Sequence, residues 1–149
     1  MRTAAILPVK SFARAKQRLG ASVADPVRQE LAAAMVSDVI AALAQTSAIE
    51  RTIVVTREAG IAEAALAAGA LLVEDAGEDG QSAAARLGID RAVQEGFERV
   101  LCVPGDCPAA DPDELGALLD GHGLAGPELV VVPDRHGSGT NGLLLRPPR

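Results

Sequence analysis

The sequence predicts an α/β fold in which a mostly parallel sheet is covered by helices. Apolar runs of strand length alternate along the chain with helical patterns, which is typical of parallel strands joined by crossover helices. The clearest strand is Val100–Val103, an unbroken apolar run that stops at the turn signal Pro104-Gly105. The chain has 149 residues, 48% of them hydrophobic, so we expect one domain over residues 1–149 with a substantial core.

The other expected strands are similar short apolar runs. They lie at Ala4–Val9, Thr52–Thr56, Ala70–Val73 and Leu129–Val132, and the apolar run Leu143–Leu145 follows them. Between Ala70–Val73 and the next helix, the acidic loop Glu74–Gly80 reads as a solvated surface turn.

The expected helices have helical spacing and clear start signals. They lie at Pro26–Leu43, Ile61–Ala68 and Gln81–Gln94, with a further helix beginning at Pro112. Asp25 and Asp111 each stand before a proline, as N-cap residues do, so Asp111, Asp113 and Glu114 have a structural explanation. In the first helix the buried face is predicted from Leu31, Met35, Val39, Ile40 and Leu43. Ser82 either caps its helix or faces a ligand.

The composition excludes several function classes. The net charge is −6 and Phe12 and Phe97 are the only aromatic residues, which argues against nucleic-acid binding. No apolar run reaches the roughly 18 residues of a membrane span, so we expect a cytoplasmic protein. Cys102 and Cys107 do not have zinc-site spacing with the two histidines, and reduced thiols are expected.

Polar residues follow three of the strands, where an open α/β sheet binds its ligands. After the first strand, a loop without acids carries Lys10, Lys16 and Arg18, cations suited to a polyphosphate. A solvated charged face is the alternative, and no glycine-rich phosphate loop is present. After Val100–Val103 comes Asp106, which either caps a turn or carries chemistry.

The third polar segment runs from Asp134 to Asn141. A hairpin turn would explain its glycines equally well. Ser138, Thr140 and Asn141 together also form an oxyanion-binding set, which favours a ligand role.

These three segments together resemble one family, the 2-phospho-L-lactate and phosphoenolpyruvate guanylyltransferases of deazaflavin coenzyme biosynthesis. The resemblance is carried by ILPVKSFARAKQRL (Ile6–Leu19), VPGDCP (Val103–Pro108) and VPDRHGSGTNGLLLRPP (Val132–Pro148). It implies a nucleotide-diphospho-sugar-transferase-like fold, a three-layer α/β sandwich. It also implies a magnesium-dependent transfer of GMP from GTP to a small phosphorylated carboxylic acid, with release of pyrophosphate.

The resemblance also assigns roles to individual residues. Lys10, Lys16 and Arg18 match the basic loop that meets the GTP phosphates, with Lys16 also counted as catalytic. Asp106 matches the catalytic, Mg²⁺-binding acid, and Thr140 matches the position that contacts the acceptor; Ser138 and Asn141 are expected beside it.

Two features depart from the family pattern. The family usually opens the helix near residue 81 with Leu-Asn, where this chain has Gln81-Ser82. Family members also continue past the equivalent of Arg149 with a glycine- and serine-bearing segment and a second metal-binding acid. We therefore expect a nucleotidyltransferase-like domain that lacks its C-terminal part, and exposed sheet edges would favour homo-oligomers.

Three other functions remain open at this point. One is a nucleotidyltransferase for another acceptor, such as a sugar phosphate or molybdopterin. Another is a non-catalytic nucleotide-binding remnant. A receiver-like signalling domain would need acids after the first strand, where this chain has cations.

Overall fold

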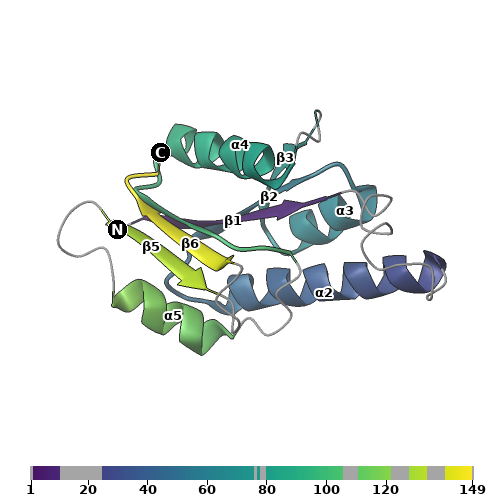
Figure 1. The fold of residues 1–149 in the computed structure, drawn as a ribbon, viewed down its shortest axis with the longest axis horizontal. Coiled ribbons are helices and arrows are strands. Elements are labelled where there is room, and N and C mark those ends of the chain that lie inside the picture. The colour runs from purple at the N-terminus through teal and green to yellow at the C-terminus, as the bar shows by residue number, and fades with distance from the viewer. Residues whose placement is uncertain are drawn as a thin grey trace.

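The computed structural model describes residues 2–10, 25–75, 77, 80–105, 111–121, 128–133 and 140–148. These residues form a six-stranded sheet with helices on both faces (Figure 1). The strands are β1 (Thr3–Val9), β2 (Arg51–Thr56), β3 (Leu71–Glu74), β4 (Arg99–Cys102), β5 (Glu128–Pro133) and β6 (Thr140–Arg146). The helices are α2 (Asp25–Gln45), α3 (Ala59–Ala67), α4 (Gln81–Gln94) and α5 (Pro112–Asp120).

The strand order is β3-β2-β1-β4-β6-β5. Strands β1 to β4 are mutually parallel, whereas β6 runs antiparallel to both of its neighbours, β4 and β5. The predicted mostly parallel α/β sheet is therefore confirmed, with boundaries within one or two residues of those expected. The run Leu143–Leu145 is the centre of β6, the one reversed strand of this sheet.

Two apolar cores lie on opposite faces of the sheet and make it a three-layer sandwich (Figure 1). Neighbouring residues of a strand point to opposite faces, so Leu7 packs with α2, α3 and α5, while Ile6 packs with α4. Helix α4 lies very close to the strands. A Cβ atom on Gly88 would overlap Cγ2 of Ile6 and lie 3.1 Å from Cγ2 of Val55, so the glycine permits this approach.

The first turns of α2 differ from the predicted amphipathic pattern. Val39, Ile40 and Leu43 are buried as expected, but Leu31 is 53% exposed. The reason is that the amino-terminal part of α2 extends past the ends of the strands, where no sheet lies beneath it (Figure 1).

Of the predictions for the other helices and loops, some were confirmed and others were not. Asp111 is the N-cap of α5, and its carboxylate accepts a hydrogen bond from the backbone N–H of Asp113 at 2.9 Å. Ser82 does not cap α4, because Gly80 occupies the cap position with a φ of 110° and no side chain caps the helix. The loop expected at Glu74–Gly80 is not wholly solvated: Asp75 is 6% exposed.

Within the described ranges, no helix combines the length and hydropathy needed to cross a membrane.

Candidate functional site

The carboxyl end of the sheet is where β1, β4 and β5 finish and where β6 begins. The backbone register establishes this, because Ile6 of β1 pairs with Cys102 of β4, and Cys102 in turn pairs with Leu143 of β6. In the next strand Val132 pairs with Gly142. The three polar segments singled out in the sequence therefore leave the sheet at one common end, as expected from strand polarity.

Close backbone contacts hold these strand ends together. A Cβ atom on Gly105 would lie 3.4 Å from Cγ2 of Val36 and 3.6 Å from the carbonyl oxygen of Pro8. The turn that leads to Asp106 thus packs against the last part of β1. Similarly, the Cβ position of Gly142 is 3.8 Å from the carbonyl oxygen of Cys102, which brings the start of β6 against the end of β4.

The predicted site residues fall into two groups. Lys10 directly follows β1 and is half-buried, and Thr140 and Asn141 are the first residues of β6. Lys10 forms no hydrogen bond or ion pair with another described residue, so its ammonium group has no partner there. The other four, Lys16, Arg18, Asp106 and Ser138, lie outside the described residues.

The third polar segment is a hairpin connection, one of the two explanations considered for its glycines. β5 and β6 pair antiparallel, with a register irregularity at Val132/Pro133. Residues 134–139, between the two strands, lie outside the described residues. The hairpin accounts for the chain reversal and leaves the ligand role of Ser138, Thr140 and Asn141 as a prediction.

Sequence reasoning overlooked a buried acid at this end of the sheet. Asp75 directly follows β3, and its backbone N–H donates to the carbonyl oxygen of Thr56, the last residue of β2, at 3.3 Å. The Thr56 hydroxyl in turn accepts from the backbone N–H of Glu58 at 3.0 Å. The sequence did contain a signal for this acid, because Asp75 follows an apolar strand just as Asp106 does. It was overlooked because Asp75 belongs to a loop whose acidic composition predicts a solvated turn.

Cys102 lies in β4 close to the same end and is a free thiol. Burial raises the pKa of this thiol to about 11. The thiol is therefore protonated at neutral pH and is a poor nucleophile and metal ligand. In the described part of the chain, no three Cys, His, Asp or Glu side chains gather as metal ligands would.

The amino end of the sheet has a different chemistry. Arg2 donates hydrogen bonds to the Glu50 carboxylate at 2.9–3.2 Å and to the carbonyl oxygen of Glu95 at 2.8 Å. Its guanidinium carbon also lies 4.6 Å from the centre of the Phe97 ring. The hydrogen bond from Arg2 lowers the pKa of Glu50. Arg99 of β4 is only 6% exposed and connects β1 with α5 at this end. It donates hydrogen bonds to the Thr3 hydroxyl at 2.9 Å and to the Leu119 carbonyl oxygen at 2.8 Å.

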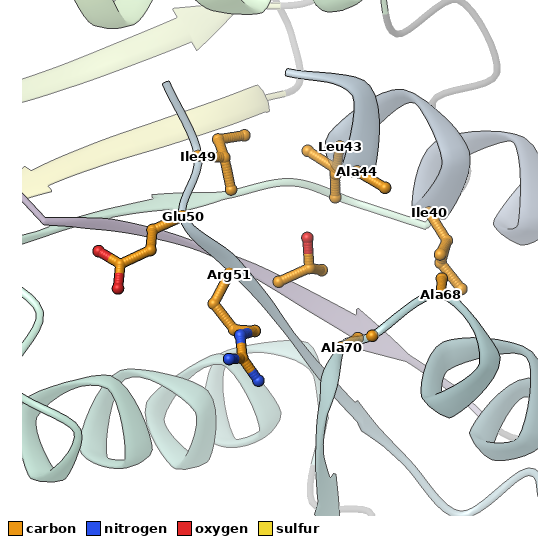
Figure 2. A pocket seen from close by; sticks show the side chains of 10 residues that line it. Ile40, Leu43, Ala44, Ile49, Glu50, Arg51, Ala68 and Ala70 are labelled. Carbon is orange, nitrogen blue, oxygen red and sulfur yellow. The ribbon is translucent and has the colours of Figure 1, made fainter. Parts of the chain in front are cut away.

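A pocket of about 120 Å³ also lies at the amino end, between α2, the end of α3 and the start of β2 (Figure 2). Its lining combines alkyl side chains, among them Ile40, Leu43 and Ile49, with the polar residues Glu50, Arg51 and Thr52. The charged groups of Glu50 and Arg51 point away from these alkyl side chains (Figure 2). The pocket is thus remote from the polar strand ends, where the sequence predicts the nucleotide site.

Comparison with known proteins identifies the family of the chain. The family described as guanylyl transferase CofC like matches residues 3–149. The chain belongs to the CofC-like guanylyl transferase family. This confirms the resemblance inferred from the three polar segments.

Two curated relatives illustrate the match of this CofC-like chain. The phosphoenolpyruvate guanylyltransferase of Conexibacter woesei is 46% identical over 148 residues, covering 99% of this chain and 66% of the relative. The 2-phospho-L-lactate guanylyltransferase of Methanothermobacter thermautotrophicus is 35% identical over 147 residues, covering 99% and 63%. The chain therefore spans about two thirds of the length of these curated relatives.

Solved structures agree on the fold. A protein from Desulfovibrio desulfuricans G20, provisionally named a nucleotide-diphospho-sugar transferase, superposes with a TM-score of 0.73 at 20% identity. The superposition covers 98% of this chain and 64% of that one. At this identity the similarity establishes the fold alone, and it confirms the predicted nucleotide-diphospho-sugar-transferase-like architecture.

Proposed function

We propose that this chain transfers GMP from GTP to phosphoenolpyruvate or 2-phospho-L-lactate and releases pyrophosphate, as a cytoplasmic step of deazaflavin coenzyme biosynthesis. The observation that carries the proposal is the family match over nearly the whole chain, with relatives whose names specify these two acceptors. The convergence of three polar segments at the carboxyl end of the sheet supports it, because ligands bind there in open α/β sheets.

The acceptor brings its own nucleophile to this reaction. Its phosphate is largely ionised near neutral pH. One phosphate oxygen attacks the α-phosphorus of GTP and forms a new P–O bond, while the bond from the α-phosphorus to the bridging oxygen breaks. Pyrophosphate leaves with that electron pair. No proton has to be removed from the nucleophile, so the protonated Cys102 thiol is not needed.

The cations after β1 would neutralise the charge that develops on the phosphates. Lys10, Lys16 and Arg18 are assigned this role, and Lys16 is also assigned as catalytic. Lys10 is supported by its position at the end of β1 and by having no partner among the described residues. Positioned cations act most strongly where water is partly excluded, and Lys10 is half-buried.

Asp106 is assigned to hold Mg²⁺ together with the nucleotide. Mg²⁺ at nucleotide sites commonly takes one or two carboxylates, with phosphate oxygens and waters as its other ligands, so a single strand-end acid suits it. When bound, the ion supplies charge neutralisation and alignment of the triphosphate. The packing of Gly105 against β1 supports this assignment, since it brings the chain before Asp106 near Lys10.

Thr140, Ser138 and Asn141 are assigned to the phosphorylated acceptor. Their hydroxyl and amide groups are suitable donors for phosphate and carboxylate oxygens. The start of β6 beside the end of β4 supports the assignment, because the acceptor phosphate has to reach the α-phosphorus held near Asp106.

Pyrophosphate release tests this proposal directly. The purified chain is incubated with GTP, MgCl₂ and either acceptor, and pyrophosphate is measured together with the phosphoanhydride product by mass spectrometry. We expect equal amounts of both products, dependent on acceptor and lost with EDTA. Parallel reactions with ATP, CTP and UTP measure the preference for guanine, and the two acceptors in competition measure the preference between them.

Two results would contradict the proposal. Calorimetric GTP binding without turnover would identify a nucleotide-binding remnant. Turnover with a sugar phosphate and with neither acid would identify a nucleotidyltransferase for another acceptor.

A further inference from the structure

The pocket between α2, α3 and β2 has no part in the proposed transfer reaction. All of its lining residues lie between Ile40 and Ala70, inside the described range 25–75. In the sheet, β1 and β4 separate β2 from β6 and β5. Ile40, Leu43 and Ile49, which line the pocket, belong to the core on the α2 face and are at most 8% exposed. A molecule in the pocket would therefore contact the core of the protein.

Thr52 adds a hydroxyl group to this pocket. Val54, two positions further along β2, packs in the core with α2 and α3, whereas Ile53 packs in the core beneath α4. Because neighbouring side chains of a strand point to opposite faces, Thr52 lies on the same face as Val54 and the pocket. The residue is only 7% exposed.

The Thr52 hydroxyl differs from those of the other three threonines that are buried in the described part of the chain. The hydroxyls at positions 3, 46 and 56 are each hydrogen-bonded within the protein at 2.8–3.0 Å. Thr52 forms no side-chain hydrogen bond with any described residue. A buried hydroxyl without a partner is costly, and such groups in folded proteins usually have one. The missing partner therefore points to a molecule in the pocket.

We propose that this pocket binds a compact, uncharged molecule that joins an alkyl or aromatic body to one hydroxyl group. The hydroxyl forms a hydrogen bond with Thr52, which can both donate and accept. The body lies against Ile40, Leu43 and Ile49 (Figure 2). The ligand is uncharged because the charged groups of Glu50 and Arg51 point away from these side chains (Figure 2).

The size of the pocket limits the ligand to a small molecule. Its volume of about 120 Å³ is slightly below that of a cavity of about 150 Å³ that binds benzene, so about six heavy atoms fit. Water alone could also bond to Thr52, but it would stay in contact with the alkyl side chains. A ligand that has both groups displaces this water and keeps the hydrogen bond, so it should bind in preference to water.

Phenol and benzene are matched probes for this proposal, because they differ by one hydroxyl group. Amide shifts of the ¹⁵N-labelled intact chain follow the titration with each probe. We expect saturable shifts at residues 49–52 and 68–70, with a dissociation constant for phenol in the millimolar range. Benzene should bind roughly fivefold to tenfold more weakly, which is the effect of one hydrogen bond. The readout is binding, so it does not depend on GMP transfer.

Variants of Thr52 test the hydrogen bond itself. Thr52→Val keeps the shape of the side chain but removes the hydroxyl, so phenol should lose its advantage over benzene. Thr52→Ser keeps the hydroxyl and should retain most of that advantage. Circular dichroism verifies that both variants are folded.

A second pair of variants tests the location. Ala44 lines the pocket from the exposed side of α2, so Ala44→Leu should fill the pocket and abolish binding of both probes. The matched control is Ala41→Leu, an exposed position of the same helix that does not line the pocket and should leave binding unchanged.

Four outcomes would overturn the proposal. Phenol could leave the pocket amides unshifted, or it could bind the wild-type chain no better than benzene; in either case water is the partner of Thr52. A preference for phenol that Thr52→Val leaves unchanged would assign the hydrogen bond to another residue. Binding that survives Ala44→Leu would place the probe elsewhere on the protein.

Discussion

The two ends of the sheet are built for different tasks. At the amino end, charged side chains bind one another and nearby carbonyl groups: Arg2 with Glu50 and Glu95, and Arg99 with Thr3 and Leu119. At the carboxyl end, Lys10 has no such partner among the described residues. The difference indicates that Arg2 and Arg99 at the amino end stabilise the fold, whereas Lys10 at the carboxyl end is available to a ligand.

Energetics explain why the two roles are separated. A charge whose hydrogen bonds are already satisfied within the protein gains little from a ligand. A cation without such bonds contributes little to folding but can bind a phosphate strongly. Substitutions of the proposed ligand-binding residues should therefore change activity at constant stability, and substitutions of Arg2 or Arg99 should do the reverse.

Asp106→Asn should give the largest effect on activity. Removing the carboxylate charge should lower GMP transfer on the order of 10³-fold, because metal and charge stabilisation are both weakened. The free energy of unfolding in urea should not change. Asp111→Asn is the matched control, since asparagine also caps helices well and Asp111 caps α5. An undiminished transfer rate in Asp106→Asn would remove this residue from the mechanism.

Arg99→Met should give the largest effect on stability. The buried guanidinium satisfies the Thr3 hydroxyl and the Leu119 carbonyl oxygen, and leaving these groups unsatisfied should cost about 2–3 kcal/mol of unfolding free energy. The transfer rate at a temperature well below unfolding should stay the same. Arg86→Met, which removes an exposed pair with Asp90, should change stability little. A loss of activity without a loss of stability would contradict the division between the two ends.

Thr140→Ala should change the KM for the acceptor but not the KM for GTP. Loss of one hydrogen bond to a charged acceptor should raise its KM roughly tenfold, with the KM for GTP unchanged. Thr140→Ser, which keeps the hydroxyl, should restore most of the affinity. Equal increases for both substrates would mean that the start of β6 is assigned to the wrong ligand.

Gly88→Ala probes the layer between the two ends and should have the smallest effect. The added methyl group meets Ile6 beneath α4, and relieving the overlap should cost about 1 kcal/mol of stability in excess of the gain in helix propensity. Gly116→Ala in α5, where a Cβ meets nothing within 4 Å, should instead stabilise the chain by about 0.5–1 kcal/mol. If Gly88→Ala also lowered the rate of GMP transfer under conditions where the variant is fully folded, the two ends of the sheet would be coupled through α4.

A structural feature could be predicted from the sequence when the interactions that form it are local in the chain. Apolar runs and Asp-Pro pairs act locally, so the strands, the helices and the cap at Asp111 were predicted well. The common position of the three polar segments was also predictable, because parallel strands have one polarity.

Contacts between distant residues could not be predicted in this way. Arg2 and Glu50 are 48 positions apart, and Arg99 and Thr3 are 96 apart, so no periodic pattern connects them. Leu31 was predicted to be buried but is exposed for the same reason, since only the tertiary arrangement reveals that α2 extends past the ends of the strands. Asp75 was overlooked because composition alone does not indicate which acid of a loop is buried.

The reversed direction of β6 has a practical consequence for handling the protein. β1 starts at the amino end of the sheet, and β6, running against β4, finishes there as well, so residues 2 and 148 both lie far from the proposed nucleotide site (Figure 1). A fluorescent protein or an immobilising tag fused at either terminus would leave the opposite end open to diffusing substrates. Tethered enzyme should accordingly turn over at the rate of the free chain.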